Sequence, residues 1–599
     1  MARGRAYWAS LTTTRPTVRG FGGAVAAGHH LAAQIGAHEL ARGGNAADAA
    51  CAMGFALWVL EPTQNGPGGE VPILVRDARR ERVYAISGQG PAPAAATIDR
   101  VRSEGFDLLP PDGLVSACVP GALDAWCALL AEFGTRRLAD VIAPARALAE
   151  RGFPMYPFLR ELLELVAPRF ERSWPTSAAI YLPVRELGER QTNPPLARWF
   201  ASLCDAERAA GGSREAGIRA ARDSFYRGAG AQAIDRFARI PVRDVSRDKH
   251  AGLLRADDLA RYAGAVEEPL SVDYRGARVY KSGPWSQAPV FLQQLRLLDG
   301  FDLAARGPAS ADGLHLWIET AKLAFADRDA CYGDPRFADV PIDTLLSREY
   351  AASRRSLVDP EKASLELRPG IGRLPAGWPL IAEDGVAAHP SEPGALAAAS
   401  RGRTDTTQCA AVDAAGNAVS ATPSGGWILT SPVIPELGFP LGTRLQMASL
   451  DADHPNGLAP GKRPRTTLSP TLAQLADGRW LAFGTPGGDQ QDQWTSQFFL
   501  RLAAHGERDL QAAIDAPTVH SEHMPSSFWP RLARPGAVSV ESRLDPAVLR
   551  ELEARGHRLE RKGPWEHGRV LAAAVDPSGG PQEAAASPRF AVAYAIALP

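Results

Sequence analysis

The pattern of hydrophobic and polar positions predicts helices and strands in alternation. Residues 45–60 are apolar nearly all round, which is typical of a helix buried on every side, and Asn45 stands where an N-cap residue is expected. An apolar strand is predicted at 71–76. The stretch 121–260 is predicted to be mostly helical, and 274–280 resembles the edge of a strand pair. Individual helices are predicted at 122–133, 138–151, 158–165, 197–209, 288–298 and 309–325.

The Gly/Pro loop between the first helix and the first strand, residues 61–69, does not predict a nucleotide site. Loops that cradle phosphate follow a strand and open a helix, because the helix N-terminus supplies the amide donors. Here the order is reversed.

The periodic pattern disappears between about Glu361 and Arg403, where Ala, Gly, Pro and Ser dominate. A loop of this length inside a compact protein is usually functional or disordered. It ends at Asp405-Thr406, directly before a strand-like run that starts near Cys409. A reactive threonine at such a junction suits a self-cleaving amidase, because cleavage turns its amine into the catalytic base. We therefore predict a processing segment at 360–405 and a nucleophile at Thr406, with an ordinary surface insertion as the alternative.

A hairpin is predicted directly after this threonine. Two apolar runs, 407–412 and 418–422, flank the turn-forming residues 413–417. If Val412 pairs with Ala418, each outward step keeps the register, and Thr406 falls opposite Ser424. Two hydroxyls then meet where the strand pair opens, although a one-residue bulge would break this pairing.

A second motif, Phe483 to Asp489, follows a predicted strand at 480–483. Its consecutive glycines, Gly487 and Gly488, can turn two backbone N–H groups toward one point. Such a pair of donors is the usual way to hold a developing oxyanion. Pro-Gly-Gly is also a plain turn, so the motif gains meaning only beside a nucleophile.

Composition and charge narrow the function classes. The chain has 599 residues, 45% hydrophobic and 22% charged, with a net charge of −1 and no long Lys/Arg run. Length suggests several domains, and the charge disfavours nucleic acid or an anionic membrane as a partner. The six cysteines form no CxxC pair, so we expect buried free thiols and neither a disulfide framework nor a zinc site.

The N-terminus carries positive charge but no apolar core of the length a signal peptide needs, and no apolar run is long enough to cross a membrane. The expected location is the cytoplasm, unless a misassigned start codon conceals a signal peptide. His520 and His523 lack a third ligand in the sequence, so we interpret them as a structural pair and predict no metal site.

With these residues assembled, the chain resembles the gamma-glutamyltransferase family of N-terminal-nucleophile (Ntn) hydrolases. The likeness runs in order along nearly the whole chain. It is carried by Gly43–Ala50, Glu61–Pro62 with the glycine loop, Val119–Ala122, Phe225–Gly228, Gly252–Leu259, Phe325–Asp329, Pro460–Pro464 and Gly484–Gly488.

The resemblance implies an α+β fold, a four-layer αββα sandwich with two stacked, mainly antiparallel sheets between helical layers. It also implies a proenzyme that cuts itself between Asp405 and Thr406. The pieces, 1–405 and 406–599, would stay intertwined as one domain. No cofactor is implied, and the predicted partners are a small-molecule amide and water, with the oligomeric state left open.

The resemblance also assigns roles by position. Thr406 would be the nucleophile, and its freed α-amine, with a pKa of about 7.7–8.0, the base. Ser424 takes the place of a family threonine whose hydroxyl supports the nucleophile. Gly487 and Gly488 match the oxyanion hole.

The substrate-recognition residues depart from the family pattern. Gln89 stands where the family has the arginine that grips the substrate α-carboxylate, and a neutral amide cannot supply a charged bidentate clamp. In the family, two serines help this arginine to grip the α-carboxylate, and Thr466 and Thr467 stand in their places here. Gly426 stands where the family has an asparagine that binds the substrate α-amine. Arg444 lies in the loop that meets the same ammonium group, and its positive charge would repel that group.

Several neighbours keep two interpretations. Asp451 is close enough in sequence to belong to the site. Arg444 or Arg465 could meet a substrate carboxylate from a new direction, or be a solvated surface charge. Asp489 could line the pocket together with the glutamines at 490 and 491, or cap a helix start. Trp427 and Trp494 could shape an apolar pocket or be ordinary core residues.

The sequence therefore predicts a self-processing threonine amidohydrolase that forms an acyl-enzyme and transfers it to water. Its substrate would be a small amide other than a standard gamma-glutamyl peptide, as in the divergent branch with oxamate amidohydrolases and acylase-like enzymes. One alternative is a genuine gamma-glutamyl hydrolase or transpeptidase acting on glutathione or gamma-glutamyl amides. A more distant one is an unprocessed, non-catalytic scaffold.

Overall fold

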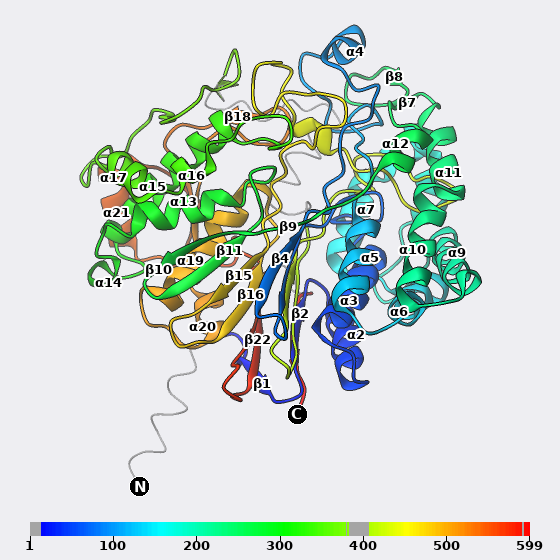
Figure 1. The fold of residues 1–599 in the computed structure, drawn as a ribbon. Helices are drawn as coiled ribbons and strands as arrows, with labels where there is room; N and C mark the ends of the chain where they lie inside the picture. Colours follow the sequence, from blue (N-terminus) through cyan, green and yellow to red (C-terminus); the bar gives the residue numbers. More distant parts are fainter. Residues whose placement is uncertain (1–12, 379, 382–405, 590–591) are drawn as a thin grey trace.

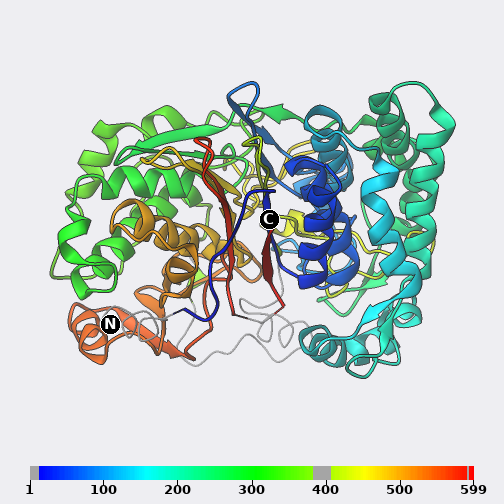
Figure 2. The same ribbon diagram turned by 90° about the horizontal axis from the view of Figure 1, so that it is seen from below.

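Two stacked β-sheets lie between layers of helices in the computed structural model of the uncut chain (Figures 1 and 2). The structure describes residues 13–378, 380–381, 406–589 and 592–599. Each large sheet has seven strands, and all neighbouring strands within them are antiparallel. The predicted four-layer αββα sandwich is confirmed.

The first sheet has the order β23-β2-β13-β14-β3-β4-β9. Its strands are β23 (Tyr594–Ala597), β2 (Ala24–Ala27), β13 (Cys409–Val412), β14 (Ala418–Ala421), β3 (Ile73–Asp77), β4 (Arg82–Ile86) and β9 (Val266–Glu267). The second has the order β1-β22-β21-β16-β15-β11-β10. These strands are β1 (Val18–Gly20), β22 (Gln582–Ala586), β21 (Leu571–Val575), β16 (Trp480–Gly484), β15 (Thr471–Gln474), β11 (Ala277–Lys281) and β10 (Leu270–Tyr274).

Alternation of side chains along each strand builds three apolar interfaces. On β2, Val25 and Ala27 face the helices, whereas Ala24 and Ala26 face the second sheet. On β13, Ala410 and Val412 share the interface with the second sheet. Alanine is frequent at that interface on both sheets, which lets the two sheets approach closely. The apolar core therefore has three layers, one between the two sheets and one between each sheet and its helices.

One helical layer covers the first sheet. Helix α3 (Ala46–Leu60) has all of its residues buried, and the Asn45 side chain accepts from the amides of Ala47 and Asp48 in a capping box, so both predictions for this helix are confirmed. The layer also contains α2 (His30–Ala41) and α5 (Ala122–Phe133), with α6 (Leu138–Arg151), α7 (Pro157–Ser173), α9 (Pro194–Ala210), α10 (Arg214–Tyr226) and α11 (Ala229–Ala238) packed around them.

The other layer covers the second sheet with α13 (Pro289–Leu298), α15 (Ala311–Cys331), α19 (Gln491–Ala503), α20 (Leu510–Asp515) and α21 (Pro546–Ala554). Helices α5 and α6 match the predicted ranges, whereas α7 and α15 run further than predicted. The predicted strand-pair edge at 274–280 is the hairpin of β10 and β11. The six cysteines are buried free thiols, as predicted.

Both sheets contain strands from before and strands from after residue 405. β13 and β14 lie between β2 and β3, and β15, β16, β21 and β22 lie between β1 and β11. The division of the chain into 1–405 and 406–599 itself stays a prediction. Within the processing segment, the described residues 360–378 contain neither helix nor strand, whereas residues 380–381 form the short strand β12 (Leu380–Ile381), paired with β18 (Leu532–Ala533). Asp405 lies outside the described residues.

Among the described residues, no helix is both long and apolar enough to span a bilayer.

Candidate active site

Thr406 and Ser424 face each other at the open end of the β13–β14 hairpin. The register pairs Cys409 with Ala421, and an isolated bridge pairs Thr406 with Ser424, so the predicted register is confirmed without a bulge. The two hydroxyl oxygens are 3.2 Å apart, and each can donate to the other. Both residues are buried, with exposures of 1% and 0%. The nucleophile predicted from sequence thus has a second hydroxyl within hydrogen-bond distance.

Gln408 connects this hairpin to the second sheet. Its Oε1 accepts from Thr422 Oγ1 at 2.6 Å, and its Nε2 donates to Ser420 Oγ at 3.0 Å. Ser420 Oγ donates in turn to the carbonyl of Phe483 on β16 at 2.9 Å. A Cβ on Gly484 would come within 2.4 Å of Gln408 Oε1, so this close approach requires glycine. Sequence reasoning missed Gln408, although its position two residues after the nucleophile was a signal.

The strand that Gln408 contacts leads into the predicted oxyanion glycines. Gly487 has φ +132° and Gly488 has φ +55°, conformations that L side chains rarely adopt. A Cβ on Gly487 would meet the Trp494 ring at 2.2 Å, and Gln287 Nε2 donates to the Gly488 carbonyl at 3.2 Å. Trp494 therefore packs beneath the loop as part of the core. The loop is held firmly, as a preorganised donor pair must be.

Arg444 is an interior residue that contacts Ser424. It lies in the 3-10 helix η1 (Arg444–Met447) and is 3% exposed. Its guanidinium forms an ion pair with Glu70, and its Nη2 donates to Ser424 Oγ at 3.0 Å. The ring of Trp427 lies 5.4 Å from the guanidinium carbon. The interpretation of Arg444 as a solvated surface charge is therefore wrong, and its contact with a substrate carboxylate stays a prediction.

Glu70 is also buried, and burial raises the pKa of its carboxyl group while Arg444 opposes that shift. The backbones of Glu70 and Ser424 exchange two hydrogen bonds of 2.9 Å. A Cβ on Gly69 would lie 2.1 Å from the Ser424 carbonyl oxygen. The glycines of this loop thus let its backbone pass close to Ser424. This close approach explains why the loop is rich in glycine, and no phosphate-binding function is needed to explain it.

The residues predicted to bind substrate are buried, and two of them have orphaned polar atoms. Gln89 donates through Nε2 to the Gly90 carbonyl at 3.0 Å, whereas its Oε1 lacks a partner among the described residues. Thr467 Oγ1 likewise lacks one, and Thr466 Oγ1 accepts from the Leu468 amide at 3.4 Å. Unpaired buried polar groups are costly, so a binding function for Gln89 and Thr467 is reasonable. Their roles stay predictions.

Asp489 follows the oxyanion glycines inside η2 (Gly488–Gln490). Its carboxylate accepts from the Ser527 amide at 2.7 Å and from Ser527 Oγ at 2.6 Å, and it forms an ion pair with the buried Arg328. It therefore anchors the loop to its surroundings, and its predicted contact with substrate is untested. Gln491 accepts from the Ser469 amide at 3.0 Å.

Two other neighbours have different surroundings. Asp451 is ion-paired with the half-exposed Arg373 at 2.6 Å. Gly426 has φ +62°, and a Cβ there would lie 2.9 Å from the Gly69 amide nitrogen. Arg465 is 5% exposed, so its interpretation as a surface charge is wrong.

Glu61 lies beside Thr407, the residue that follows the predicted nucleophile. A Cβ built on Gly28 would lie 2.1 Å from Thr407 Oγ1 and 2.8 Å from Glu61 Oε2. The hydroxyl and the carboxyl group therefore both pack against the backbone of Gly28. Burial raises the pKa of Glu61 from 4.5 to about 7. This carboxyl group is therefore partly protonated near neutral pH.

The raised pKa predicts a pH-dependent stability. An acid whose pKa is higher in the folded than in the unfolded state loses stability as pH rises from the unfolded to the folded pKa, here from 4.5 to about 7. Over this pH range the free energy of unfolding falls by about 3 kcal/mol. We expect Glu61→Gln to remove this part of the pH dependence, measured as denaturant unfolding between pH 5 and 8. Glu436→Gln, at an exposed position, is the control, and an unchanged pH dependence in Glu61→Gln would contradict the assignment.

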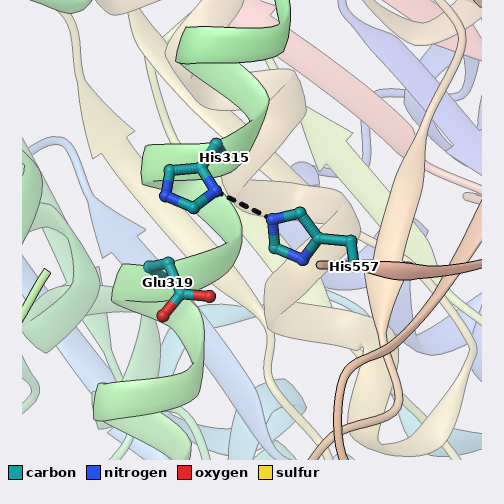
Figure 3. Close-up of side chains that lie close together, drawn as sticks. All are labelled: His315, Glu319 and His557. Carbon is teal, nitrogen blue, oxygen red and sulfur yellow. Dashed lines mark hydrogen bonds between the residues drawn. The ribbon is translucent and has the colours of Figure 1, made fainter. Parts of the chain in front are cut away.

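One cluster has the residue types of a metal site (Figure 3). His315 Nε2 lies 2.7 Å from the Asp359 carbonyl oxygen, which can only accept, so this nitrogen carries the proton. His315 Nδ1 then accepts from His557 Nε2 at 2.8 Å. The third residue, Glu319, is bound by the Lys322 ammonium at 2.6 Å. A divalent cation would have to displace this ammonium, so we interpret the cluster as a neutral histidine pair beside an ion pair.

The two histidines singled out in the sequence have separate surroundings. His520 Nε2 lies 3.4 Å from a Glu522 carboxylate oxygen, and the His520 ring contacts Trp494 edge-on. His523 accepts from the Gly536 amide at 3.0 Å and contacts the Glu366 carbonyl through its other nitrogen. Their structural interpretation is consistent with these bonds.

Comparison with known proteins identifies the family of this chain. The family model described as Gamma-glutamyltranspeptidase matches residues 32–597. This chain belongs to that family. The Acylase ACY 1 proenzyme of Pseudomonas sp. (strain SE83) is 31% identical over 585 residues, which cover 95% of this chain and 93% of the relative. The glutathione hydrolase proenzyme of Bacillus subtilis (strain 168) is 29% identical and covers 93% of this chain and 88% of its own length.

Solved structures give the same result. A structure of LmbA2991HD superimposes with a TM-score of 0.91 at 46% identity, covering 98% of this chain and all (100%) of that one. The cephalosporin acylase of Bacillus halodurans has a TM-score of 0.80 at 29% identity, with 98% of both chains covered. Members of the gamma-glutamyltranspeptidase family, this chain included, are self-processing Ntn hydrolases, so the predictions of family, fold and enzyme class are confirmed.

Proposed function

We propose that this gamma-glutamyltranspeptidase family member cuts itself between Asp405 and Thr406 and then hydrolyses a small amide through an ester on Thr406. The observation that carries the proposal is the buried contact of 3.2 Å between Thr406 Oγ1 and Ser424 Oγ. Gln408 and Ser420 link this contact to the strand that bears the oxyanion glycines. Nucleophile and oxyanion donors are thus fixed relative to one another.

In the self-cleavage step, Thr406 Oγ1 attacks the carbonyl carbon of Asp405. The Asp405–Thr406 amide breaks, an ester forms, and the proton of the hydroxyl passes to the departing amine of Thr406. Water then hydrolyses the ester, which releases the carboxyl group of Asp405 and frees the hydroxyl and α-amine of Thr406. Ser424, whose oxygen accepts from Arg444, lies within hydrogen-bond distance of Thr406 Oγ1 and can hold this oxygen in place for the attack.

In the amidase step, the α-amine takes the proton of Thr406 Oγ1 as the oxygen attacks the substrate carbonyl. The amides of Gly487 and Gly488 stabilise the oxyanion, and the leaving amine takes the proton from the α-ammonium. Water, deprotonated by the same amine, attacks the ester carbonyl, the acyl–oxygen bond to Thr406 breaks, and the α-ammonium returns its proton to Thr406 Oγ1. Each half-reaction returns the amine to its neutral form. The pKa of an α-amine, about 7.7–8.0, suits this exchange near neutral pH.

The altered recognition residues support an acyl group other than gamma-glutamyl. Gln89 lacks the charge that would clamp an α-carboxylate, and Arg444 is engaged with Glu70 and Ser424 in the region of the expected ammonium. Acylase-like hydrolysis of a small amide is therefore our first candidate. Glutathione hydrolysis is the second, because proteins so named align over nearly the whole chain.

The test has two readouts on one preparation. A denaturing gel with N-terminal sequencing should show two pieces, the smaller beginning Thr-Thr-Gln-Cys. Oxamate and a panel of simple acyl amides should be hydrolysed faster than gamma-glutamyl-p-nitroanilide. Rapid turnover of the gamma-glutamyl compound alone would favour the second candidate, and an uncut, inactive chain would contradict both.

A further inference from the structure

The two predicted oxyanion amides belong to two successive peptide units, one between Pro486 and Gly487 and one between Gly487 and Gly488. A peptide unit is planar and trans, so its carbonyl and its N–H point in opposite directions. Any group that holds the carbonyl of such a unit therefore also aims its N–H. The direction of the two donors is thus set by the partners of the Pro486 and Gly487 carbonyls.

Each of these carbonyls accepts a hydrogen bond from within the same loop. The Gln490 amide donates to the Gly487 carbonyl at 3.0 Å, which aims the Gly488 amide through backbone contacts alone. Thr485 Oγ1 lies 2.9 Å from the Pro486 carbonyl oxygen, and the hydroxyl is the donor because a carbonyl can only accept. The Gly487 amide is therefore aimed by a side chain.

The peptide unit between Pro486 and Gly487 requires such a restraint. Proline fixes its own φ, but the unit still turns about ψ of Pro486 and φ of Gly487. Glycine adopts a wider range of φ than other residues, and Gly487 has φ +132°. The Trp494 ring limits where Gly487 can lie, because a Cβ there would meet the ring at 2.2 Å. Packing of this kind has no preferred direction, whereas the hydrogen bond from Thr485 does.

Thr485 itself is fixed relative to the nucleophile. It is the first residue after β16 and is 1% exposed. Two residues earlier, the Phe483 carbonyl accepts from Ser420 Oγ, and Gln408 Nε2 donates to the same Ser420 oxygen. Gln408 follows Thr406 by two positions. The hydroxyl that holds the Pro486 carbonyl thus belongs to the same framework as the attacking oxygen.

We propose that Thr485 is a positioning residue of the oxyanion hole, whose hydroxyl holds the Pro486–Gly487 peptide unit so that the Gly487 amide faces the reacting carbonyl. This role rests on the proposed amidase function and adds to it a residue that acts through the backbone, without contact with the substrate. A bond that only satisfied a buried carbonyl would contribute to stability and leave the rate of the folded enzyme unchanged.

The kinetic test removes the hydroxyl and keeps the shape of the side chain. In Thr485→Val, kcat on the best amide of the panel should fall by about 10- to 100-fold, less than the loss of a whole oxyanion donor, while KM stays within about 3-fold. Thr485→Ser keeps the donor and should retain most of the rate. Thr320→Val is the matched control, because this fully buried hydroxyl donates to the Leu316 carbonyl at 2.8 Å on α15. It should leave kcat of the folded fraction unchanged.

Crystal structures of wild type, Thr485→Ser and Thr485→Val test the restraint without any substrate. The Pro486 carbonyl should point at the hydroxyl in the first two, and in Thr485→Val the peptide unit should be rotated or occupy two orientations. Thr485→Ala takes the place of the valine variant if that variant does not fold.

An unrotated peptide unit, an undiminished kcat in Thr485→Val, or equal losses in Thr485→Val and Thr320→Val would each overturn the role of Thr485. If wild type hydrolyses no amide of the panel, the proposed function fails separately. The crystal structures then decide alone: a rotated unit in the variant supports the restraint, and an unrotated unit rejects it.

Discussion

Thr406→Ala is expected to leave the chain as one uncut band of 599 residues and to lower amidase activity by at least about 10⁴-fold. The substitution removes both the oxygen that attacks the Asp405 carbonyl and the oxygen that would carry the acyl group. Denaturing gels and initial rates on the best substrate of the panel measure the two effects. Thermal unfolding should change little, because the side chain lost is small.

The neighbouring threonine is the matched control for this experiment. Thr407 has the same side chain one position later, and it lies against Gly28 instead of Ser424. Thr407→Ala should still cut before residue 406. If Thr407→Ala abolishes cleavage and Thr406→Ala does not, the choice of nucleophile is wrong.

Arg444→Met is expected to affect stability and rate in separable ways. It leaves the buried Glu70 carboxylate without its cation, which should cost about 3–5 kcal/mol of unfolding free energy. It also removes the donor to Ser424 Oγ. The double variant Arg444→Met with Glu70→Gln should recover most of the stability, because no buried charge remains. It should not recover the rate, for which we expect a loss of about 10- to 100-fold in both variants.

Lys322→Met is the control for a broken buried ion pair elsewhere. Lys322 and Glu319 are as buried as Arg444 and Glu70, but both lie on α15. This variant should lose stability while the folded fraction keeps its rate. If the Arg444–Glu70 double variant regains full activity, Arg444 does not act on catalysis through Ser424.

Much of the site could be predicted because it depends on short-range pattern. The hairpin register follows from five turn residues between two apolar runs, and it placed Ser424 opposite Thr406 correctly. Asn45 and the fully apolar helix after it are equally local signals. The family resemblance supplied the layered fold, which no single periodicity indicates.

The remaining features depend on contacts between distant segments. Glu70 and Arg444 are 374 positions apart, and Gln408 acts through a strand that begins at Trp480. From sequence, Arg444 and Arg465 could have been surface residues, because charged residues are usually exposed. Only the packed structure shows the buried carboxylates with which they form ion pairs.

The presence of strands from 1–405 and from 406–599 in both sheets has a consequence for the cut molecule. Neither piece retains a complete sheet alone, so the two halves cannot part while either stays folded. After denaturation, they must meet again as two molecules, and recovery of activity will depend on protein concentration, whereas refolding of the uncut chain will not.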